Sequence, residues 1–217
     1  MTDNMIGTIL GPKGSGKSQL TGEIVLEHPR VVVLDFVGEY GRDLGVDECW
    51  GFKDSLAALR WAARAKTFRL SLRDLTDRDR EDLLEVLFEL KDHLLVVEEA
   101  SVLCSPSSMP ESLKRIVAIG RHRKISQLYV AQRPSLINRL VTSQSDWIVA
   151  FRQNEDRDVE YLVSCYGERM AGVRELADYQ IAFGGNAGKA PRAIVRRLRE
   201  QAVGRKKVAA GAGEVHP

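Results

Sequence analysis

Near its N-terminus the chain contains the segment Gly11-Pro12-Lys13-Gly14-Ser15-Gly16-Lys17-Ser18. It fits the phosphate-binding (Walker A) pattern G-x-x-x-x-G-K-[S/T] at every constrained position. The apolar run 6–10 precedes it, and an amphipathic stretch, 17–27, follows it. A strand, a glycine-rich loop and a helix in this order let backbone N–H groups wrap a phosphate, because glycine adds no Cβ to obstruct it.

This loop predicts a nucleoside triphosphate, ATP, and Mg²⁺ as ligands. We expect Lys17 to contact the β- and γ-phosphates and Ser18 to ligate Mg²⁺, with the positive end of the following helix adding to the attraction. A glycine-rich turn that binds nothing is the alternative, and the full match in its proper context disfavours it. The residues expected to contact the nucleotide are Gly11, Pro12, Lys13, Gly14, Ser15, Gly16, Lys17, Ser18 and Gln19.

Two carboxylates, Glu98 and Glu99, follow the apolar residues 94–97. We expect Glu98 to be a metal ligand at the strand end and Glu99 to polarise an attacking water, which gives both a catalytic role. Glu98 occupies the position where most Walker B motifs have Asp, and its extra methylene changes the geometry of the metal site. The alternative is a buried strand that ends in two solvated acids.

Gln132 follows another apolar run, 127–131. We expect it beside the γ-phosphate, where a neutral amide orients water or senses the loss of phosphate. The alternative is a polar residue in the turn before Pro134. Asp35, at the end of the run 31–35, and Glu39 are candidates for holding a water or the Mg²⁺ shell, and for Asp35 a turn cap is the alternative.

Short apolar runs alternate with amphipathic stretches along the chain, which predicts an α/β fold with a mainly parallel sheet and helices on both faces. The predicted strands are 6–10, 31–35, 68–72, 94–98, 127–131 and 147–151. The predicted helices are 17–27, 54–66, 77–92, 111–121, 135–144 and 156–166. Residues 179–183 and 193–198 flank a glycine-rich turn, which predicts a C-terminal hairpin at the sheet edge. We expect one domain, 1–203, and a disordered tail, 204–217, because the tail lacks apolar periodicity.

Composition limits the class of protein. The 217 residues are 44% hydrophobic and 29% charged, which is typical of a globular domain and excludes a disordered, collagen-like or polytopic membrane chain. The N-terminus shows no signal-peptide pattern, and the three cysteines are far apart in the sequence. We therefore expect a reducing cytoplasm.

The small net charge of +2 conceals an uneven distribution. Residues 1–110 contain 13 basic and 19 acidic side chains, whereas residues 111–217 contain 19 basic and 11 acidic ones. Clustered Lys and Arg neutralise nucleic-acid phosphates, although a solvated basic face explains the same pattern. The residues expected to contact a DNA backbone are Lys114, Arg115, Arg123, Lys124 and Arg139.

These motifs, taken in order, resemble the HerA–FtsK superfamily of DNA-pumping ATPases. The resemblance rests on Glu98-Glu99, Gly120-Arg121, Gln132-Arg133-Pro134-Ser135 and the segment 34–40, and it spans roughly residues 5–200. Ala131 replaces the usual Thr before the Gln-Arg-Pro core. A motor without additional domains most resembles the genome-packaging ATPases of tailless viruses with an internal membrane.

The resemblance implies a P-loop NTPase fold of the RecA/FtsK kind and a ring homo-oligomer, usually a hexamer, that threads double-stranded DNA without sequence specificity. It also implies an Arg that reaches the neighbour's γ-phosphate, and Arg121 matches this position best. Arg123 and Arg152 are the other candidates. Capsid or membrane vertex proteins are implied partners, and the host cytoplasm or the packaging vertex of the virion is the implied location.

The function expected is ATP-driven translocation of double-stranded DNA during packaging of a viral genome into a preformed capsid. One alternative is a cellular or plasmid HerA-like translocase that acts with a partner. Another, from a different class, is a P-loop kinase for a small molecule. Gln132 at a strand end is typical of motors, and no Arg-rich lid is evident in the sequence, so the kinase is disfavoured.

Overall fold

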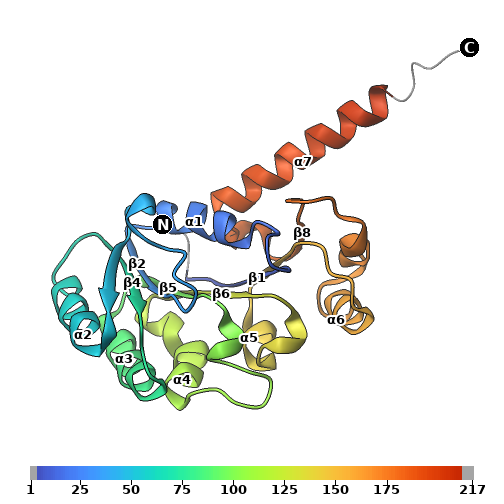
Figure 1. Ribbon diagram of the computed structural model, residues 1–217. Coiled ribbons are helices and arrows are strands. Elements are labelled where there is room, and N and C mark those ends of the chain that lie inside the picture. The colour runs from blue at the N-terminus through green and yellow to red at the C-terminus, as the bar shows by residue number, and fades with distance from the viewer. Residues whose placement is uncertain (1–3, 212–217) are drawn as a thin grey trace, which may run out of the picture.

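An eight-stranded sheet forms the centre of the computed structural model, which describes residues 4–211 (Figure 1). The strands are β1 (Ile6–Leu10), β2 (Arg30–Leu34), β3 (Asp47–Trp50), β4 (Phe68–Arg73), β5 (His93–Val97), β6 (Ile125–Ala131), β7 (Trp147–Ala150) and β8 (Ala182–Gly185). Their order is β3-β4-β2-β5-β6-β1-β7-β8. Every neighbouring pair is parallel except β7 and β8. The predicted α/β fold with a mainly parallel sheet is confirmed.

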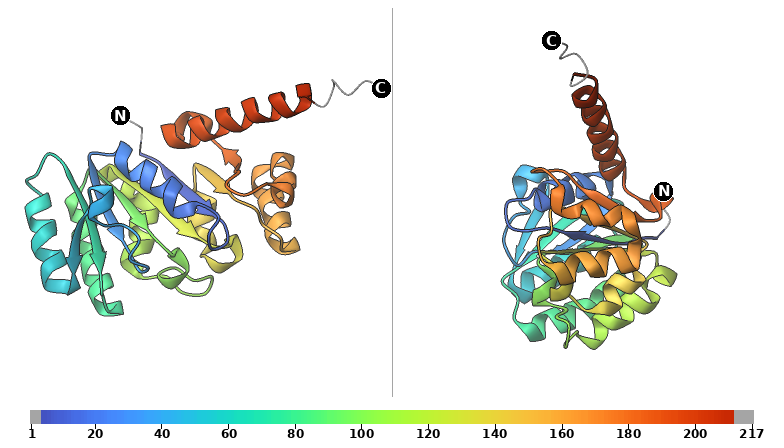
Figure 2. Two further views of the ribbon diagram at one scale, coloured as in Figure 1. Left: turned by 45° about the horizontal axis from the view of Figure 1, so that its top comes forward. Right: turned by 90° about the vertical axis from the view of Figure 1, so that its right-hand side faces the viewer.

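Helices cover both faces of the sheet (Figures 1 and 2). The helices are α1 (Lys17–Glu27), α2 (Gly51–Ala62), α3 (Asp77–Leu90), α4 (Glu111–Ile119), α5 (Arg139–Gln144), α6 (Asp156–Tyr166) and α7 (Arg192–Gly211). Helices α2 to α5 lie on one face, and α1 lies on the other with the start of α7 beside it. Thr76 begins α3 with a capping box, in which its hydroxyl accepts from the Asp79 N–H and the Asp79 carboxylate accepts from the Thr76 N–H.

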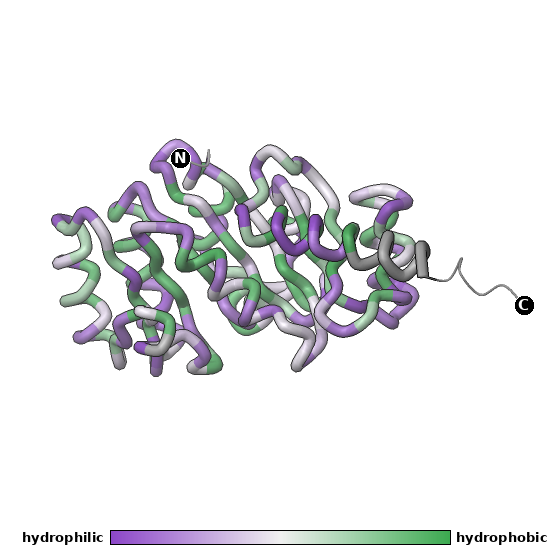
Figure 3. Tube along the Cα trace, turned by 90° about the horizontal axis from the view of Figure 1, so that it is seen from above, coloured by the Kyte–Doolittle hydropathy of each residue, from purple (hydrophilic) through white to green (hydrophobic). Residues whose placement is uncertain are grey.

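Strand residues alternate between two hydrophobic cores, one on each face of the sheet. In β2, Val32 and Leu34 join the core under α2 to α4, whereas Val31 and Val33 join the core under α1. All four side chains are fully buried. Figure 3 shows hydrophobic residues gathered along the inner strands, whereas the outer helices and loops carry both hydrophobic and hydrophilic residues. The two cores therefore hold the ends of the strands from both faces of the sheet.

The predicted C-terminal hairpin is wrong. β8 pairs antiparallel with β7 at the sheet edge, but residues 193–198 belong to α7. The Glu27 carboxylate accepts the N–H groups of Arg192 and Ala193 at 2.9 and 2.6 Å, which caps the start of this helix. The side chains of Ala193 and Ile194 are buried in the core under α1. A tertiary cap and a buried helical face thus decide the conformation of this segment.

Two further differences concern chain segments. β3 was not predicted, because Cys49 is the only buried residue of this short strand and no apolar run marks it. Helix α7 continues to Gly211, so residues 204–211 of the expected disordered tail are helical. The rest of that tail, 212–217, lies outside the described residues. Among residues 4–211, no helix has both the length and the apolar character needed to cross a bilayer.

Candidate active site

The phosphate-binding loop connects β1 to α1 and depends on glycine at two positions with positive φ. Gly14 has φ +78° and Gly16 has φ +99°, a region that side chains disfavour. A Cβ on Gly16 would also lie 2.9 Å from Cδ1 of Tyr179. The backbone therefore takes a path that the glycines of the motif make possible, and α1 begins directly after it.

Lys17, the first residue of α1, is 8% exposed. Its Nζ donates a 3.0 Å hydrogen bond to the carbonyl of Pro12 across the loop. Burial lowers the pKa of Lys17, while the carboxylates of Glu98, Glu99 and Glu39 oppose that shift. The ammonium group thus lies between the loop and a set of acidic side chains.

A cleft of about 440 Å³ opens at the carboxyl ends of β1, β5 and β6, where ligands bind in open α/β sheets. Nine residues predicted from the sequence line it: Lys13, Gly14, Gly16, Lys17, Ser18, Gln19, Glu98, Glu99 and Gln132. Val37, Glu39 and Tyr179 complete its lining. Gly11, Pro12 and Ser15 belong to the loop itself and are not part of the lining. Residues far apart in the sequence therefore meet in one cleft.

Glu98 follows β5 and is 2% exposed. Burial raises its pKa to about 7, whereas the hydrogen bond from Tyr40 and the charge of Lys17 act in the opposite direction. The Tyr40 hydroxyl donates to Oε2 of Glu98 at 2.6 Å. This bond was not predicted, because it depends on how the chain folds after β2.

Asp35 shapes the loop that carries Tyr40. Its carboxylate accepts the backbone N–H groups of residues 38–40 at 2.7, 3.2 and 3.1 Å. Ser71 donates to the same carboxylate at 3.0 Å, and Arg73 pairs with it at 3.0 Å. Of the two roles left open for Asp35, the structure shows the turn cap. Glu39, in contrast, is exposed and lines the cleft.

Glu99 and Gln132 approach each other from the ends of β5 and β6. Gln132 Nε2 lies 3.4 Å from Glu99 Oε2, and Ser101 donates to the other carboxylate oxygen at 2.8 Å. Glu99 has φ +46°, an uncommon conformation for a residue with a side chain. Both side chains face the same cleft as Lys17.

The donor atoms of the cleft suit Mg²⁺. The Ser18 hydroxyl and the Glu98 carboxylate are hard oxygen donors, which this ion prefers. Mg²⁺ takes few protein ligands and completes its shell with water and phosphate oxygens. Within residues 4–211, no three His, Cys, Asp or Glu side chains form a metal-binding group.

The three arginines considered for action on a neighbouring subunit differ in their contacts. Arg123 pairs with Glu89, and Arg152 donates to the Leu176 carbonyl at 2.7 Å and pairs with Asp178. Arg121 is exposed and makes no ion pair with any described side chain. It lies before the start of β6, whereas the cleft lies after its end, roughly 20 Å away at the rise of a seven-residue strand. Arg121 therefore does not reach the cleft of its own chain.

Acidic side chains compensate part of the positive charge in the basic half of the chain, 111–217. Glu85 on α3 pairs with Arg115, and Glu111 pairs with Lys114. The Arg115 guanidinium also lies 4.0 Å from the centre of the Phe88 ring. The sequence therefore overstates the free positive charge here, because α3 packs against α4 and brings its glutamates with it.

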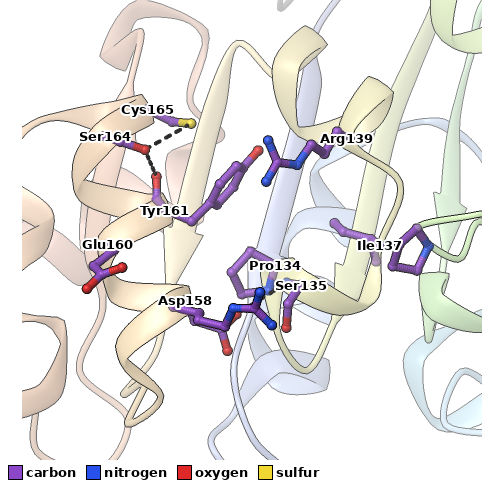
Figure 4. Close-up of a pocket in the computed structure, with 11 residues that line it drawn as sticks. Pro134, Ser135, Ile137, Arg139, Asp158, Glu160, Tyr161, Ser164 and Cys165 are labelled. Atoms are coloured by element: carbon purple, nitrogen blue, oxygen red, sulfur yellow. Dashed lines mark hydrogen bonds between the residues drawn. The ribbon is translucent and has the colours of Figure 1, made fainter.

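A second hollow of about 600 Å³ lies beside the residues that follow Gln132 (Figure 4). Arg139 points toward the ring of Tyr161, with 5.5 Å between the guanidinium carbon and the ring centre. Asp158, 1% exposed, accepts from Arg133 Nε at 2.5 Å. This ion pair joins the chain after β6 to α6 and so fixes the path of the Gln-Arg-Pro segment.

Comparison with solved structures shows what the fold resembles. The genome packaging NTPase B204 from Sulfolobus turreted icosahedral virus 2, in complex with ATP-gammaS, has a TM-score of 0.70 at 16% identity, over 88% of this chain and 96% of that chain. The pCW3 conjugation coupling protein TcpA has a TM-score of 0.57 at 13% identity, over 85% of this chain and 58% of that one. VirB4 of Thermoanaerobacter pseudethanolicus has a TM-score of 0.55 at 12% identity, over 87% and 90%.

Comparison by sequence identifies no family for this chain. No protein-family model matches the chain, and no curated protein matches it by sequence. At identities of 12% to 16%, this chain is similar to these structures in fold alone. The chain shares its fold with B204, TcpA and VirB4, and the predicted P-loop NTPase fold is confirmed.

Proposed function

We propose that this chain is an ATP-hydrolysing motor that translocates double-stranded DNA and packages a viral genome into a preformed capsid. The proposal rests on the cleft, in which Lys17, Glu99 and Gln132 converge beside the phosphate-binding loop. The likeness in fold to the packaging NTPase B204, over nearly the whole of both chains, supports the choice of substrate.

Five side chains of the cleft have distinct roles in hydrolysis. The loop N–H groups and Lys17 bind the β- and γ-phosphates. Ser18 and Glu98 would hold Mg²⁺, which would neutralise charge on the phosphates. Glu99 accepts a proton from the attacking water, and Gln132, 3.4 Å from the Glu99 carboxylate, keeps that water oriented.

The motor works as a ring homo-oligomer, and a hexamer is the expected size. Arg121 of one subunit contacts the γ-phosphate held by the next, where a positive charge stabilises phosphoryl transfer. Its exposure and its distance from the cleft of its own chain support this arrangement. Capsid or membrane vertex proteins are the partners that this role requires, in the host cytoplasm or at the packaging vertex of the virion.

A cellular or plasmid translocase is the second candidate, and one observation favours it. The conjugation coupling protein TcpA shares the fold over 85% of this chain. The two candidates share the motor chemistry and differ in the partner that positions the ring. They are distinguished by whether purified empty capsids or a plasmid-encoded partner stimulate the motor.

The experiment that tests the proposal is ATP hydrolysis with and without long double-stranded DNA across a salt series. We expect strong stimulation that fades as salt rises, because backbone contacts release counterions. Lys17→Ala is the control that removes the phosphate contact and all stimulation. Hydrolysis that is indifferent to DNA at every salt concentration would contradict the DNA substrate while leaving the nucleotide site intact.

A further inference from the structure

Tyr179 is an exposed aromatic residue at the rim of the nucleotide cleft. Its side chain is 59% exposed, although tyrosine is a large and partly apolar residue. It lines the same cleft as Gly16, Ser18 and Gln19. Its ring approaches the phosphate-binding loop, since Cδ1 lies 2.9 Å from the place where a Cβ on Gly16 would be.

Tyr179 and the catalytic side chains lie on opposite sides of β1, across the cleft. Glu99 and Gln132 follow β5 and β6, on one side of β1 in the sheet. Tyr179 precedes β8, and β7 and β8 lie on the other side of β1. A nucleoside triphosphate carries its γ-phosphate at one end and its base at the other. With the γ-phosphate at the carboxylates, the base extends toward Tyr179.

The turn that presents Tyr179 is braced in an unfavourable conformation. Tyr179 has φ +64°, which persists only where the surroundings enforce it. Arg152 Nε donates to the Leu176 carbonyl at 2.7 Å, and its Nη2 lies 3.2 Å from the Asp178 carboxylate. The Gln180 N–H closes the turn on the Ala177 carbonyl at 3.1 Å. Arg152, two residues after the end of β7, thus ties this turn to the sheet.

We infer that Tyr179 forms the base subsite of the cleft, where its ring stacks on the nucleobase of the bound nucleoside triphosphate, and that Arg152 is a positioning residue for that ring. The inference rests on the proposed function, because it takes the cleft as a nucleotide site. Arg152 then acts within its own chain and not on the γ-phosphate of a neighbouring subunit. Stacking uses the face of the ring, so the hydroxyl of Tyr179 is not required.

The test compares equilibrium binding of ATP with that of inorganic tripolyphosphate, which keeps the phosphates and lacks the base. Tyr179→Ala is expected to weaken ATP binding about tenfold, within the range measured for base–aromatic stacking, and to leave tripolyphosphate binding unchanged. Tyr179→Phe retains the ring and is expected to bind ATP within about twofold of the wild type, because its π-face is preserved. Trp61→Ala removes a comparably exposed aromatic residue, 56% exposed on α2, and serves as the matched control.

The role of Arg152 is tested by a double-mutant cycle. Arg152→Ala is expected to weaken ATP binding but not tripolyphosphate binding. Combined with Tyr179→Ala, it is expected to add almost nothing, because both changes remove one interaction. Additive losses, or a loss of tripolyphosphate binding in Arg152→Ala, would overturn the positioning role.

Failure of the base subsite is distinguishable from failure of the proposed function. If the wild type binds ATP and Tyr179→Ala binds it equally well, the stacking inference is wrong and the nucleotide site stands. If Tyr179→Phe loses as much affinity as Tyr179→Ala, the hydroxyl is responsible and stacking is again wrong. If the wild type binds neither ATP nor tripolyphosphate, the inference and the proposed function are both overturned.

Discussion

The hydroxyl of Tyr40 donates a 2.6 Å hydrogen bond to Oε2 of Glu98 across 58 positions of sequence. Tyr40 is fully buried and Glu98 nearly so, and both belong to loops that follow strands of the same sheet. Asp35 fixes the loop of Tyr40 by accepting three of its backbone N–H groups. The orientation of Glu98 at the cleft therefore depends on residues that do not line it.

Tyr40→Phe should lower both stability and turnover. A buried carboxylate that loses its donor is left with an unsatisfied oxygen, which costs about 1–3 kcal/mol of unfolding free energy. Turnover should fall because Glu98 is no longer held. Denaturant unfolding and phosphate release measure the two effects.

Tyr166→Phe is the matched control for Tyr40→Phe. The Tyr166 hydroxyl donates to the Thr142 carbonyl at 2.7 Å and does not line the cleft. This change should cost about 1 kcal/mol of stability, the ordinary value of a hydrogen bond, and leave turnover unchanged. Equal turnover in the two variants would show that the Tyr40 contact is purely structural.

Glu99→Gln should bind ATP as the wild type does and hydrolyse it about 10²–10⁴-fold more slowly, the usual contribution of a general base. The amide retains the size of the side chain and cannot accept the proton. Fluorescent nucleotide binding and phosphate release separate these two properties. The control is Glu111→Gln, an exposed acid that pairs with Lys114 outside the cleft. Unchanged turnover in Glu99→Gln would reject the base assignment.

Arg121→Ala should retain ATP binding and lose turnover, since an arginine supplied by a neighbour contributes about 10³-fold or more. Mixing it with Lys17→Ala subunits should restore part of the activity, because some interfaces then combine an intact Arg121 with an intact Lys17. Arg60→Ala, an exposed arginine on α2, is the control. Absence of recovery in rings shown by co-purification to contain both variants would contradict action in trans.

His93 should make the protein less stable in mild acid. It is 4% exposed at the start of β5, and burial lowers its pKa from 6.5 to about 4, an effect that Arg30 reinforces and Asp92 opposes. Because the folded pKa is the lower one, the unfolded chain takes up a proton first as the pH falls. The stability contribution is complete above about pH 6.5 and declines toward about pH 4, by roughly 3 kcal/mol in all.

The measurement for His93 is the free energy of unfolding against pH, compared with His93→Leu. Leu fits an apolar site and does not titrate, so this variant should lose less stability between pH 6.5 and pH 4. The difference between the two curves isolates the imidazole from the carboxylates that titrate in the same range. Parallel curves would show that His93 does not carry the acid sensitivity.

Sequence patterns predicted most of the fold because apolar runs mark buried strands. They missed β3, where only Cys49 is buried, and misassigned residues 193–198, whose helix depends on a cap from Glu27. These features arise from tertiary contacts between distant segments, which local periodicity does not encode.

Some residues of the candidate site could likewise be predicted from the sequence, and others could not. The positions of Lys17, Glu98 and Gln132 follow from motifs at strand ends, since parallel strands end at one edge of the sheet. Tyr40 and Tyr179 were not predicted as site residues, because their places depend on the Asp35 loop and on the turn that Arg152 holds. No pattern in one sequence reveals such contacts.

Displacement of a third strand from a DNA triplex tests whether hydrolysis in the cleft moves the ring along duplex DNA. We expect ATP-dependent displacement by the wild type at low salt and none by Lys17→Ala or Glu99→Gln. Displacement should fall as salt rises, because the contacts go to the DNA backbone. DNA-stimulated hydrolysis by the wild type without any displacement would contradict the claim.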